Sequence, residues 1–521
     1  MKFIKYEFCV LWILSLCPLS SCTTKEEKAN PNIIIILADD FGVGYIQAHY
    51  PDNKIPTLYL DKLVQGGMSF NDAYSKSGVC SPSRYSLLTG RYNWRTPLQE
   101  WVLAPYEPPL IKTERTTLLE YLQSEGYHTA CIGKWHLGWN WVGEQPSTWE
   151  EKKHILKDSV WYFDQELSGG PLDHGFDYYF CTDVPNFPSF TFIENNKILI
   201  QPTSKLDLKT NVSARFTSKI FDGYQMAPEW QFDQILLDIT KKAVDFISEE
   251  AKKDNPFFLY FSITSPHEPV SSSKQFLGKS SIAPVADFVM EPDWSLGQII
   301  EAVKAANISE NTLIIFTADN GHTPYTGWKK LIEAGHYPSG SYRGYKGNIW
   351  EGGHRVPMIA YWSEKITSGI ENSAIIFQTD FYATIHELVS DNQVNVEKAE
   401  DSFSFLNLLK DEGADPKQKT MVNHSRNGEF AYRKGKLVFR IPGKDLKSSR
   451  GELAKVALYN LEKDISETEN VAQNYAELVE ELTEELRVIV DNGTSYKKKV
   501  LNNNVKVDFK TIQKHRWLLL N

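Results

Sequence analysis

The stretch Asn32–Ala38 (NIIIILA), followed at once by Asp39 and Asp40, decides how this chain folds. A continuous β-branched run is typical of a strand that is buried on both faces of a parallel sheet. Thr312–Ala318 (TLIIFTA) repeats the design and also runs directly into an acid, Asp319. The sequence therefore predicts two strands that deliver carboxylates at the same end of one sheet.

Two further apolar runs extend this sheet. Residues 256–264 (PFFLYFSIT) lead to His267, and residues 127–133 lead to Lys134 and His136. Patterns typical of helices lie between the strands, at residues 57–64, 116–125 and 235–250. Such an alternation predicts an α/β fold, in which helices flank an open, mostly parallel sheet.

The carboxyl ends of these strands mark the expected site. In open α/β sheets the binding crevice lies beyond the carboxyl ends of the strands, so residues far apart in the sequence can meet there. Each polar residue alone could be an ordinary loop residue. Because four apolar strands all end in charged or imidazole side chains, we expect one composite site.

After about residue 400 the pattern changes to shorter and more polar segments. Residues 430–432 and 436–440 flank a turn and predict a hairpin, and residues 471–491 predict an amphipathic helix. We therefore expect a signal peptide at 1–22, a main domain at 23–400 and a smaller α+β domain at 401–521. The smaller domain would hold a short antiparallel sheet and a helix.

Composition and charge limit the functions that are possible. The 521 residues are 41% hydrophobic and 23% charged, which is typical of a globular chain rather than a disordered one. With 56 basic and 66 acidic residues, the net charge of −10 gives no global positive field to attract nucleic acid. An anionic ligand would have to be held by a local site.

The amino terminus predicts export. An apolar run at residues 8–19 is shorter than the ~20 residues of a membrane span and fits a signal peptide. The run ends in LSSC, which resembles the lipobox of bacterial lipoproteins, so Cys22 would carry a lipid that anchors the protein in the outer membrane. The following KEE resembles a surface-export signal but is also an ordinary polar tether, so cell surface and periplasm both stay open.

Three cysteines remain after the signal peptide: Cys80, Cys131 and Cys181. This number does not fit a disulfide framework. Cys131 and Cys181 lie in apolar stretches and are expected to be buried thiols. Cys80 instead lies in GVCSPSRYSLLTGR (78–91), which predicts a short helix with Ser81 as its cap and its amino end open to an anion.

The sequence CSPSR at 80–84, continued by LTGR at 88–91, resembles the signature of the type I, arylsulfatase-like sulfatases. In that family the cysteine is oxidised to Cα-formylglycine (3-oxoalanine). Further motifs follow in the family's order: Asp39-Asp40, GKWHLG (133–138), SPH (265–267), DNG (319–321), and Lys346 with EGG (351–353). The resemblance covers residues 32 to about 360 and implies an alkaline-phosphatase-like fold and the hydrolysis of sulfate esters.

A metal site is part of this resemblance. Asp39, Asp40, Asp319 and Asn320 offer hard oxygen ligands, which favour Ca²⁺ or Mg²⁺ over Zn²⁺. The resemblance implies Ca²⁺, with the formylglycine oxygen at Cys80 as a further ligand. Because neighbouring residues of a strand point to opposite faces, the backbone must turn where Asp39 and Asp40 meet one ion.

The resemblance also implies catalytic roles. Lys134 and Lys346 would neutralise the sulfate ester, and an extended segment would project Lys134 and His136 on one side, about 7 Å apart at ~3.3 Å per residue. The hydrated aldehyde would attack sulfur while His267 protonates the leaving oxygen. His136, assisted by the cation of Arg84, would then deprotonate the second hydroxyl. A sulfatase-maturating enzyme is an implied partner. Arg84 and His267 could also be structural residues.

The substrate is predicted from sequence matches that are less specific than the signature motif. YNWRT (92–96) and the loop at 335–346 resemble bacterial relatives of N-acetylgalactosamine-6-sulfatase. These are exo-acting and remove 6-O-sulfate from terminal galactose or N-acetylgalactosamine of mucin or glycosaminoglycan fragments. Asp183 and His336 are candidate sugar contacts, although each can equally be a structural loop residue. Cys181 and Thr182 depart from the family's pattern, which puts fine specificity in doubt.

Three alternatives stay open. A phosphatase or phosphodiesterase of the same superfamily would use a Ser or Thr nucleophile and His and Asp ligands for two metals, and His322 is the one histidine within the acid clusters. A sulfatase for another sugar position is a second alternative. A non-catalytic, glycan-binding lipoprotein on the same fold is the third.

Overall fold

The computed structural model describes residues 30–143, 161–210, 221–411, 413–416, 420–443, 455–497 and 499–507, together with residues 1 and 215. Cys22 and residues 2–21 of the predicted signal peptide lie outside this range. Within the described part of the chain, no helix combines the length and the apolar character that crossing a bilayer requires.

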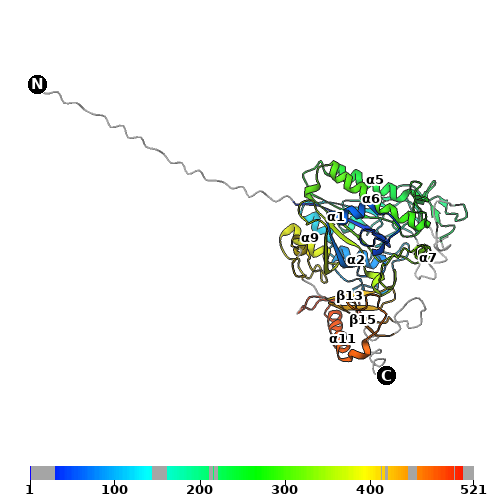
Figure 1. The fold of residues 1–521 in the computed structure, drawn as a ribbon. Helices are drawn as coiled ribbons and strands as arrows, with labels where there is room; N and C mark the ends of the chain where they lie inside the picture. Colours follow the sequence, from blue (N-terminus) through cyan, green and yellow to red (C-terminus); the bar gives the residue numbers. More distant parts are fainter. Residues whose placement is uncertain are drawn as a thin grey trace.

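A ten-stranded mixed sheet organises the larger part of the molecule (Figure 1). In β1 all seven residues are buried and Ile33 to Ala38 are fully excluded from solvent, as expected for a central strand. β1 pairs in parallel with β10 on one side and β9 on the other, and β9 pairs in parallel with β3. The four strands expected from the sequence therefore lie side by side with their carboxyl ends at one edge. In spatial order the strands are β12 (Ile370–Phe377), β2 (Met68–Tyr74), β11 (Met358–Tyr361), β10 (Thr312–Ala318), β1 (Asn32–Ala38), β9 (Phe257–Ser262), β3 (His128–Gly133), β4 (Tyr178–Cys181), β5 (Ile193–Glu194) and β6 (Lys197–Ile198).

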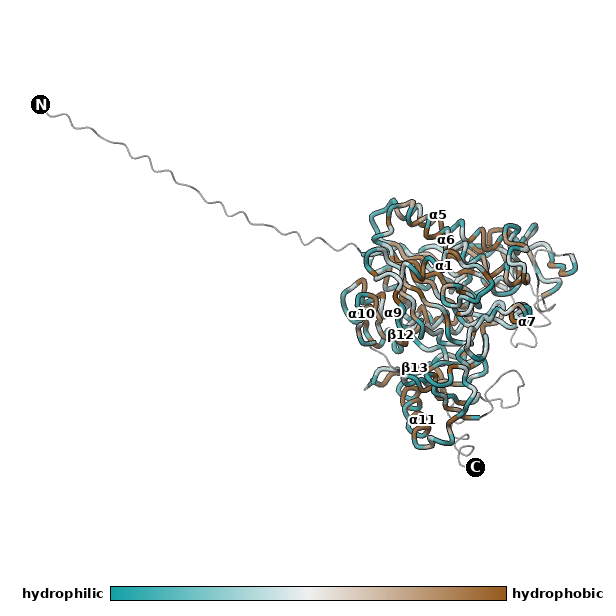
Figure 2. The backbone as a smooth tube through the Cα atoms, in the orientation of Figure 1, coloured by the Kyte–Doolittle hydropathy of each residue, from teal (hydrophilic) through white to brown (hydrophobic). Residues whose placement is uncertain are grey.

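Helices cover the sheet and keep its centre apolar, as the hydropathy colours show (Figure 2). α1 and α5 both pack against α6, and α2, α3, α9 and α10 form a second group. Cys131 and Cys181 are buried free thiols, as predicted. The helices are α1 (Leu58–Gly66), α2 (Cys80–Thr89), α3 (Leu118–Ser124), α5 (Ile235–Glu250), α6 (Pro284–Ala305), α7 (Trp328–Glu333), α8 (Glu351–His354), α9 (Asp380–Ser390) and α10 (Leu406–Lys410).

Local sequence explains where several helices begin. α5 has the predicted bounds, and α3 starts after Thr117, whose side chain accepts the backbone N–H of Glu120 in a capping box. The predicted cap of α2 is wrong. The helix already begins at Cys80 after an extended Val79, and the Ser81 hydroxyl accepts the backbone N–H of Leu103 at 3.3 Å. The Ser81 hydroxyl therefore binds a residue far along the chain instead of capping the helix, as the sequence had suggested.

The carboxy-terminal part forms a second, antiparallel sheet below the first in Figure 1. Its strands are β13 (Thr420–His424), β14 (Phe430–Lys434), β15 (Leu437–Ile441) and β16 (Ala457–Asn460). α11 (Ala476–Asp491) buries Leu482 and Leu486 in a separate core with residues of this sheet. The predicted hairpin and helix are confirmed, although α11 begins later because residues 472–475 form a 3-10 turn. The division at residue 400 stays a prediction, and α10 packs in the core of the large sheet.

The turn between β13 and β14 contacts the edge where the polar residues gather. The carbonyl of His424 accepts the N–H of Gly78 at 3.3 Å, and the N–H of Arg426 donates to Gly347 at 3.3 Å. Gly347 in turn donates to the carbonyl of Gly78 at 2.6 Å. The small sheet thus ties the segment before α2 to the segment that follows Lys346.

Candidate active site

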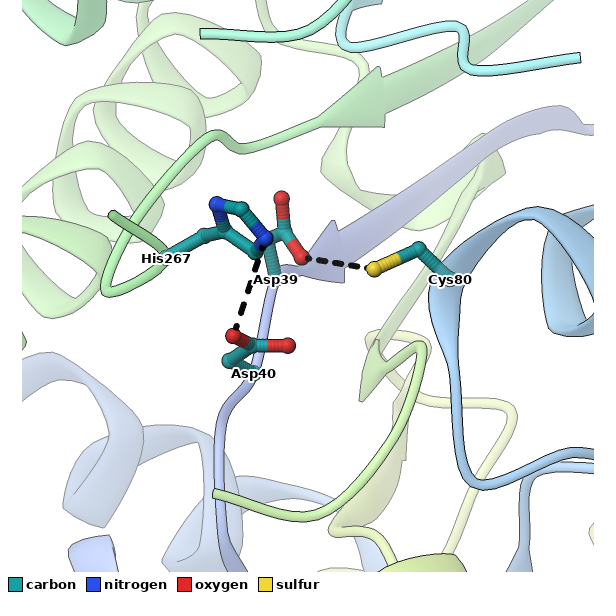
Figure 3. Close-up of side chains that lie close together, drawn as sticks. All are labelled: Asp39, Asp40, Cys80 and His267. Atoms are coloured by element: carbon teal, nitrogen blue, oxygen red, sulfur yellow. Dashed lines mark hydrogen bonds and ion pairs between the residues drawn. The ribbon is translucent and has the colours of Figure 1, made fainter. Parts of the chain in front are cut away.

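The acids at the ends of β1 and β10 form one side of the candidate site. The backbone turns at Asp40, whose φ of 64° lies in the left-handed region. This turn directs the neighbouring carboxylates of Asp39 and Asp40 into one space, as expected. Ligand atoms of these two residues, Cys80 and His267 all lie within 4.8 Å of one another (Figure 3). The cysteine at the start of α2 therefore faces the acids.

Two lysines neutralise these acids. Lys134 Nζ lies 2.7 Å from Asp39 Oδ2, and Lys346 Nζ lies 2.6 Å from Asp40 Oδ1. Asn320 donates from Nδ2 to Asp40 Oδ1 at 2.7 Å, and Asp319 Oδ1 accepts the N–H of Asp40 at 3.1 Å. The structure therefore brings together residues as far apart in the sequence as Asp40 and Lys346.

Arg84 lies behind this cluster and is fully buried. Its Nε and Nη2 donate to Asp319 Oδ2 at 3.1 and 2.8 Å, and its Nη1 donates to the carbonyl of Lys134 at 2.9 Å and to Ser262 Oγ. No hydrogen bond joins Arg84 to His136 within the described residues, so the cation acts on that ring through its charge. Sequence reasoning missed Ser262, although a hydroxyl closing an apolar strand was a usable signal.

Burial and neighbouring charge set the protonation states. Burial raises the pKa of Asp40 to about 7 and that of the Cys80 thiol to about 12. Burial would also raise the pKa of Asp39, but Lys134, Arg84 and Lys346 together hold it below its usual range. An unmodified Cys80 is therefore a protonated, unreactive thiol at neutral pH.

His136 is held with one ring nitrogen free. Its Nε2 lies 3.0 Å from the carbonyl of Leu103, and because a carbonyl can only accept, Nε2 carries the proton. Nδ1 has no partner within the described residues and presents a lone pair. Burial and the charge of Lys134 place the pKa of His136 well below its ordinary value, so the ring is neutral. Such a ring can accept a proton.

His267 faces the acids from the loop that follows β9. Its Nδ1 donates to the carbonyl of Glu268 at 2.7 Å, and its Nε2 lies 3.9 Å from Asp40 Oδ2. Burial and the charges of Lys134 and Lys346 lower the pKa of His267 well below its ordinary value. To donate a proton from Nε2, the ring must therefore gain a second proton.

The two candidate sugar contacts stay predictions. Asp183 Oδ1 accepts the N–H of His136 at 3.1 Å and the indole N–H of Trp139 at 3.3 Å, so this carboxylate positions the His136 loop. Burial raises its pKa to about 6. His336 is 1% exposed and stacks on Tyr45 with ring centroids 5.4 Å apart, so a sugar could touch it only after its loop moves.

The donor set fits a hard cation. Asp39, Asp40, Asp319 and Asn320 supply oxygens, and Asn320 Oδ1 is buried without a partner in the described part of the chain. Cys80, expected here from the resemblance, lies with Asp39 and Asp40, and the structure adds His267 to these three residues. Because the thiol stays protonated, the oxygens dominate, and they favour Ca²⁺ or Mg²⁺ over the softer metals.

Comparisons with known proteins show that this chain is similar to sulfatases. The sulfatase family model matches residues 31–391. An N-acetylgalactosamine-6-O-sulfatase of Bacteroides thetaiotaomicron is 30% identical over 518 residues, covering 90% of this chain and 96% of that protein. Human arylsulfatase A is 31% identical over 411 residues, covering 78% of this chain and 74% of the relative. A solved structure described under the metabolism of multiple glycosaminoglycans by B. thetaiotaomicron superposes with a TM-score of 0.77 at 28% identity, covering 88% of this chain and 99% of the other.

Proposed function

This chain belongs to the sulfatase family and hydrolyses sulfate esters, and from that premise we propose that it is a calcium-dependent, exo-acting carbohydrate sulfatase. Its proposed substrate is the 6-O-sulfate of terminal galactose or N-acetylgalactosamine in host mucin or glycosaminoglycan fragments. The observation that carries the chemistry is the convergence of acids, lysines and histidines around Cys80. The similarity to an N-acetylgalactosamine-6-O-sulfatase over 90% of the chain supports the substrate.

Two groups complete the proposed site. Asp39, Asp40, Asp319 and Asn320 would hold Ca²⁺, which supplies positive charge for the sulfate oxygens. Cys80, converted to formylglycine, would supply the nucleophile, a hydrated aldehyde with two hydroxyls. Because Cys80 is 1% exposed in the folded chain, the maturating enzyme must act before the chain folds.

The chain's own side chains would manage charge and protons. Lys134 and Lys346 offset the negative sulfate oxygens in a site shielded from water, where such charges act strongly. His136 Nδ1 has a free lone pair, so this residue would act as the base that takes a proton from the nucleophile. The negative charge of a bound sulfate ester favours the doubly protonated form of His267, which then gives its Nε2 proton to the leaving sugar oxygen.

We also propose that the protein is an exported lipoprotein. A lipid on Cys22 would anchor it in the outer membrane, on the cell surface or facing the periplasm, where glycan fragments are met. Incorporation of a labelled fatty acid into the expressed protein, and its loss in Cys22→Ala, measures this directly.

The substrate proposal is tested on protein co-expressed with a maturating enzyme. We expect sulfate release, in the presence of Ca²⁺, from 6-O-sulfated galactose and N-acetylgalactosamine, and none from the Cys80→Ala variant. Release from another sulfated isomer would keep the chemistry and contradict the 6-O assignment. If mass spectrometry verifies formylglycine at position 80 and no isomer is cleaved, the carbohydrate sulfatase proposal fails and glycan binding without catalysis replaces it.

A further inference from the structure

A cavity of about 880 Å³ opens beside the loop that carries His267. We propose that it binds a second, anionic sugar of the substrate chain, beyond the residue that loses its sulfate. The inference rests on the proposed carbohydrate sulfatase function and deepens it, because it makes an anionic oligosaccharide the preferred substrate.

The walls place this cavity next to the reaction centre. One wall is the two-stranded ribbon of β7 (Ser204–Lys205) and β8 (Gln225–Met226), and another begins at Val270. Val270 is three residues after His267, so their Cα atoms are at most about 11 Å apart at ~3.3–3.6 Å per residue. The backbone of Val270 is fixed by paired hydrogen bonds with Arg215 at 2.9 and 3.0 Å. A sugar linked to one bound beside His267 can therefore reach the cavity.

The lining offers the chemistry that a sugar needs. Trp230 and Met226 supply apolar surface for the C–H face of a sugar ring. The indole Nε1 of Trp230 and Oδ1 of Asp233 are both buried and lack a hydrogen-bond partner within the described residues. A buried donor and a buried acceptor left unpaired cost free energy. A sugar hydroxyl can satisfy both kinds of group because it donates and accepts.

Charge at the rim indicates an anionic sugar. Lys205, Arg215 and Lys274 border the cavity and have no ion-pair partner in the part of the chain that the structure describes. Three acids also line the cavity: Asp287 accepts two backbone N–H groups, Asp207 accepts one, and Asp233 keeps the unpaired Oδ1 that can accept a sugar hydroxyl. The lysines and the arginine are therefore available to a sulfate or a carboxylate on the second sugar.

Binding can be measured without turnover in full-length protein carrying Cys80→Ala. The probe is a 6-O-sulfated tetrasaccharide of alternating N-acetylgalactosamine and glucuronate, titrated by calorimetry. The double substitution Lys205→Ala/Lys274→Ala should weaken its binding by about tenfold or more. Trp230→Phe, which keeps a smaller aromatic ring and removes the N–H, should weaken it by a smaller factor. Lys279→Ala is the matched control, because this exposed lysine lies on the same loop outside the cavity lining. Equal binding by the double variant and the control would overturn the proposal.

Turnover measurements separate the proposed second-sugar site from the proposed carbohydrate sulfatase activity. In the enzyme with intact Cys80, the double substitution should lower kcat/KM about tenfold for the tetrasaccharide and leave the 6-O-sulfated monosaccharide unchanged. An equal loss on both substrates would refute a separate second-sugar site. If wild type cleaves neither substrate but binds the tetrasaccharide through these lysines, the carbohydrate sulfatase proposal fails and the binding cavity stands.

Discussion

Replacing Arg84 with methionine tests whether a buried guanidinium holds the acid cluster together. Arg84 is fully buried, and its Nε and Nη2 donate to Asp319 at 3.1 and 2.8 Å while its Nη1 donates to the carbonyl of Lys134 at 2.9 Å. Methionine has similar bulk but no donor, so it leaves Asp319 as a buried charge without its partner. Removing one member of a buried pair costs about 3–5 kcal/mol. We expect a loss of this size in the free energy of unfolding, measured by urea denaturation at pH 7 without calcium.

Arg487→Met is the matched control for this experiment. Arg487 pairs with Glu484 and Asp491 on α11, but its side chain is 43% exposed. Exposed pairs contribute about 0–1 kcal/mol, since water and salt screen them. If Arg84→Met costs no more than Arg487→Met, the acid cluster does not depend on the buried guanidinium and the argument is wrong.

Further substitutions test charge, catalysis and packing. Burial raises the pKa of Asp293 from 3.8 to about 7, so the folded chain retains a proton that the unfolded chain loses, and stability falls as pH rises from about 4 through 7. Asp293 accepts the N–H groups of Tyr59 and Leu60, and an Asn side chain can still accept them. Urea denaturation should therefore show the Asp293→Asn variant to be about 2–4 kcal/mol more stable than wild type at pH 8.5 and little changed near pH 4. An equal gain at both pH values would contradict this reasoning. His136→Ala should lower kcat on a small aryl sulfate by about 10²–10⁴-fold with little change in KM, and a smaller loss would remove His136 as the base. Leu482→Ala should cost about 2–5 kcal/mol of unfolding free energy, because this side chain is fully buried in the small core, and a loss below 1 kcal/mol would show that the core collapses around it.

The central strands could be predicted from the sequence because their signal is local. β1 and β10 have the bounds expected from their apolar runs, and the acids follow them directly. The partners of the functional side chains could not be predicted in this way. Ser262 meets Arg84, and the carbonyl of Leu103 meets His136, through contacts across 178 and 33 positions of sequence. Such contacts depend on strand order and loop path, which no short run of residues encodes.

The candidate sugar contacts were also hard to predict, because they depend on contacts between distant parts of the sequence. Asp183 carries a charge in a loop near the site, which made it a candidate contact, but its partners are backbone and indole N–H groups. Trp230 and Lys274 line one cavity although the sequence places them in different segments. The structure shows that Trp230 and Lys274 line the same cavity as Val270, which lies in the loop after His267.

The neighbouring strands β3, β9, β1 and β10 lead into the acids, Lys134 and the histidines, and α2 begins at Cys80, whereas the ribbon of β7 and β8 forms a separate two-stranded sheet. Because this ribbon pairs with none of the central strands, a change in its length leaves their register unchanged. The central strands and α2 therefore fix the geometry of the reaction, and the ribbon of β7 and β8 can be altered apart from it. For protein engineering, this makes the ribbon of β7 and β8 the segment to exchange when hydrolysis of the sulfate ester is to be kept.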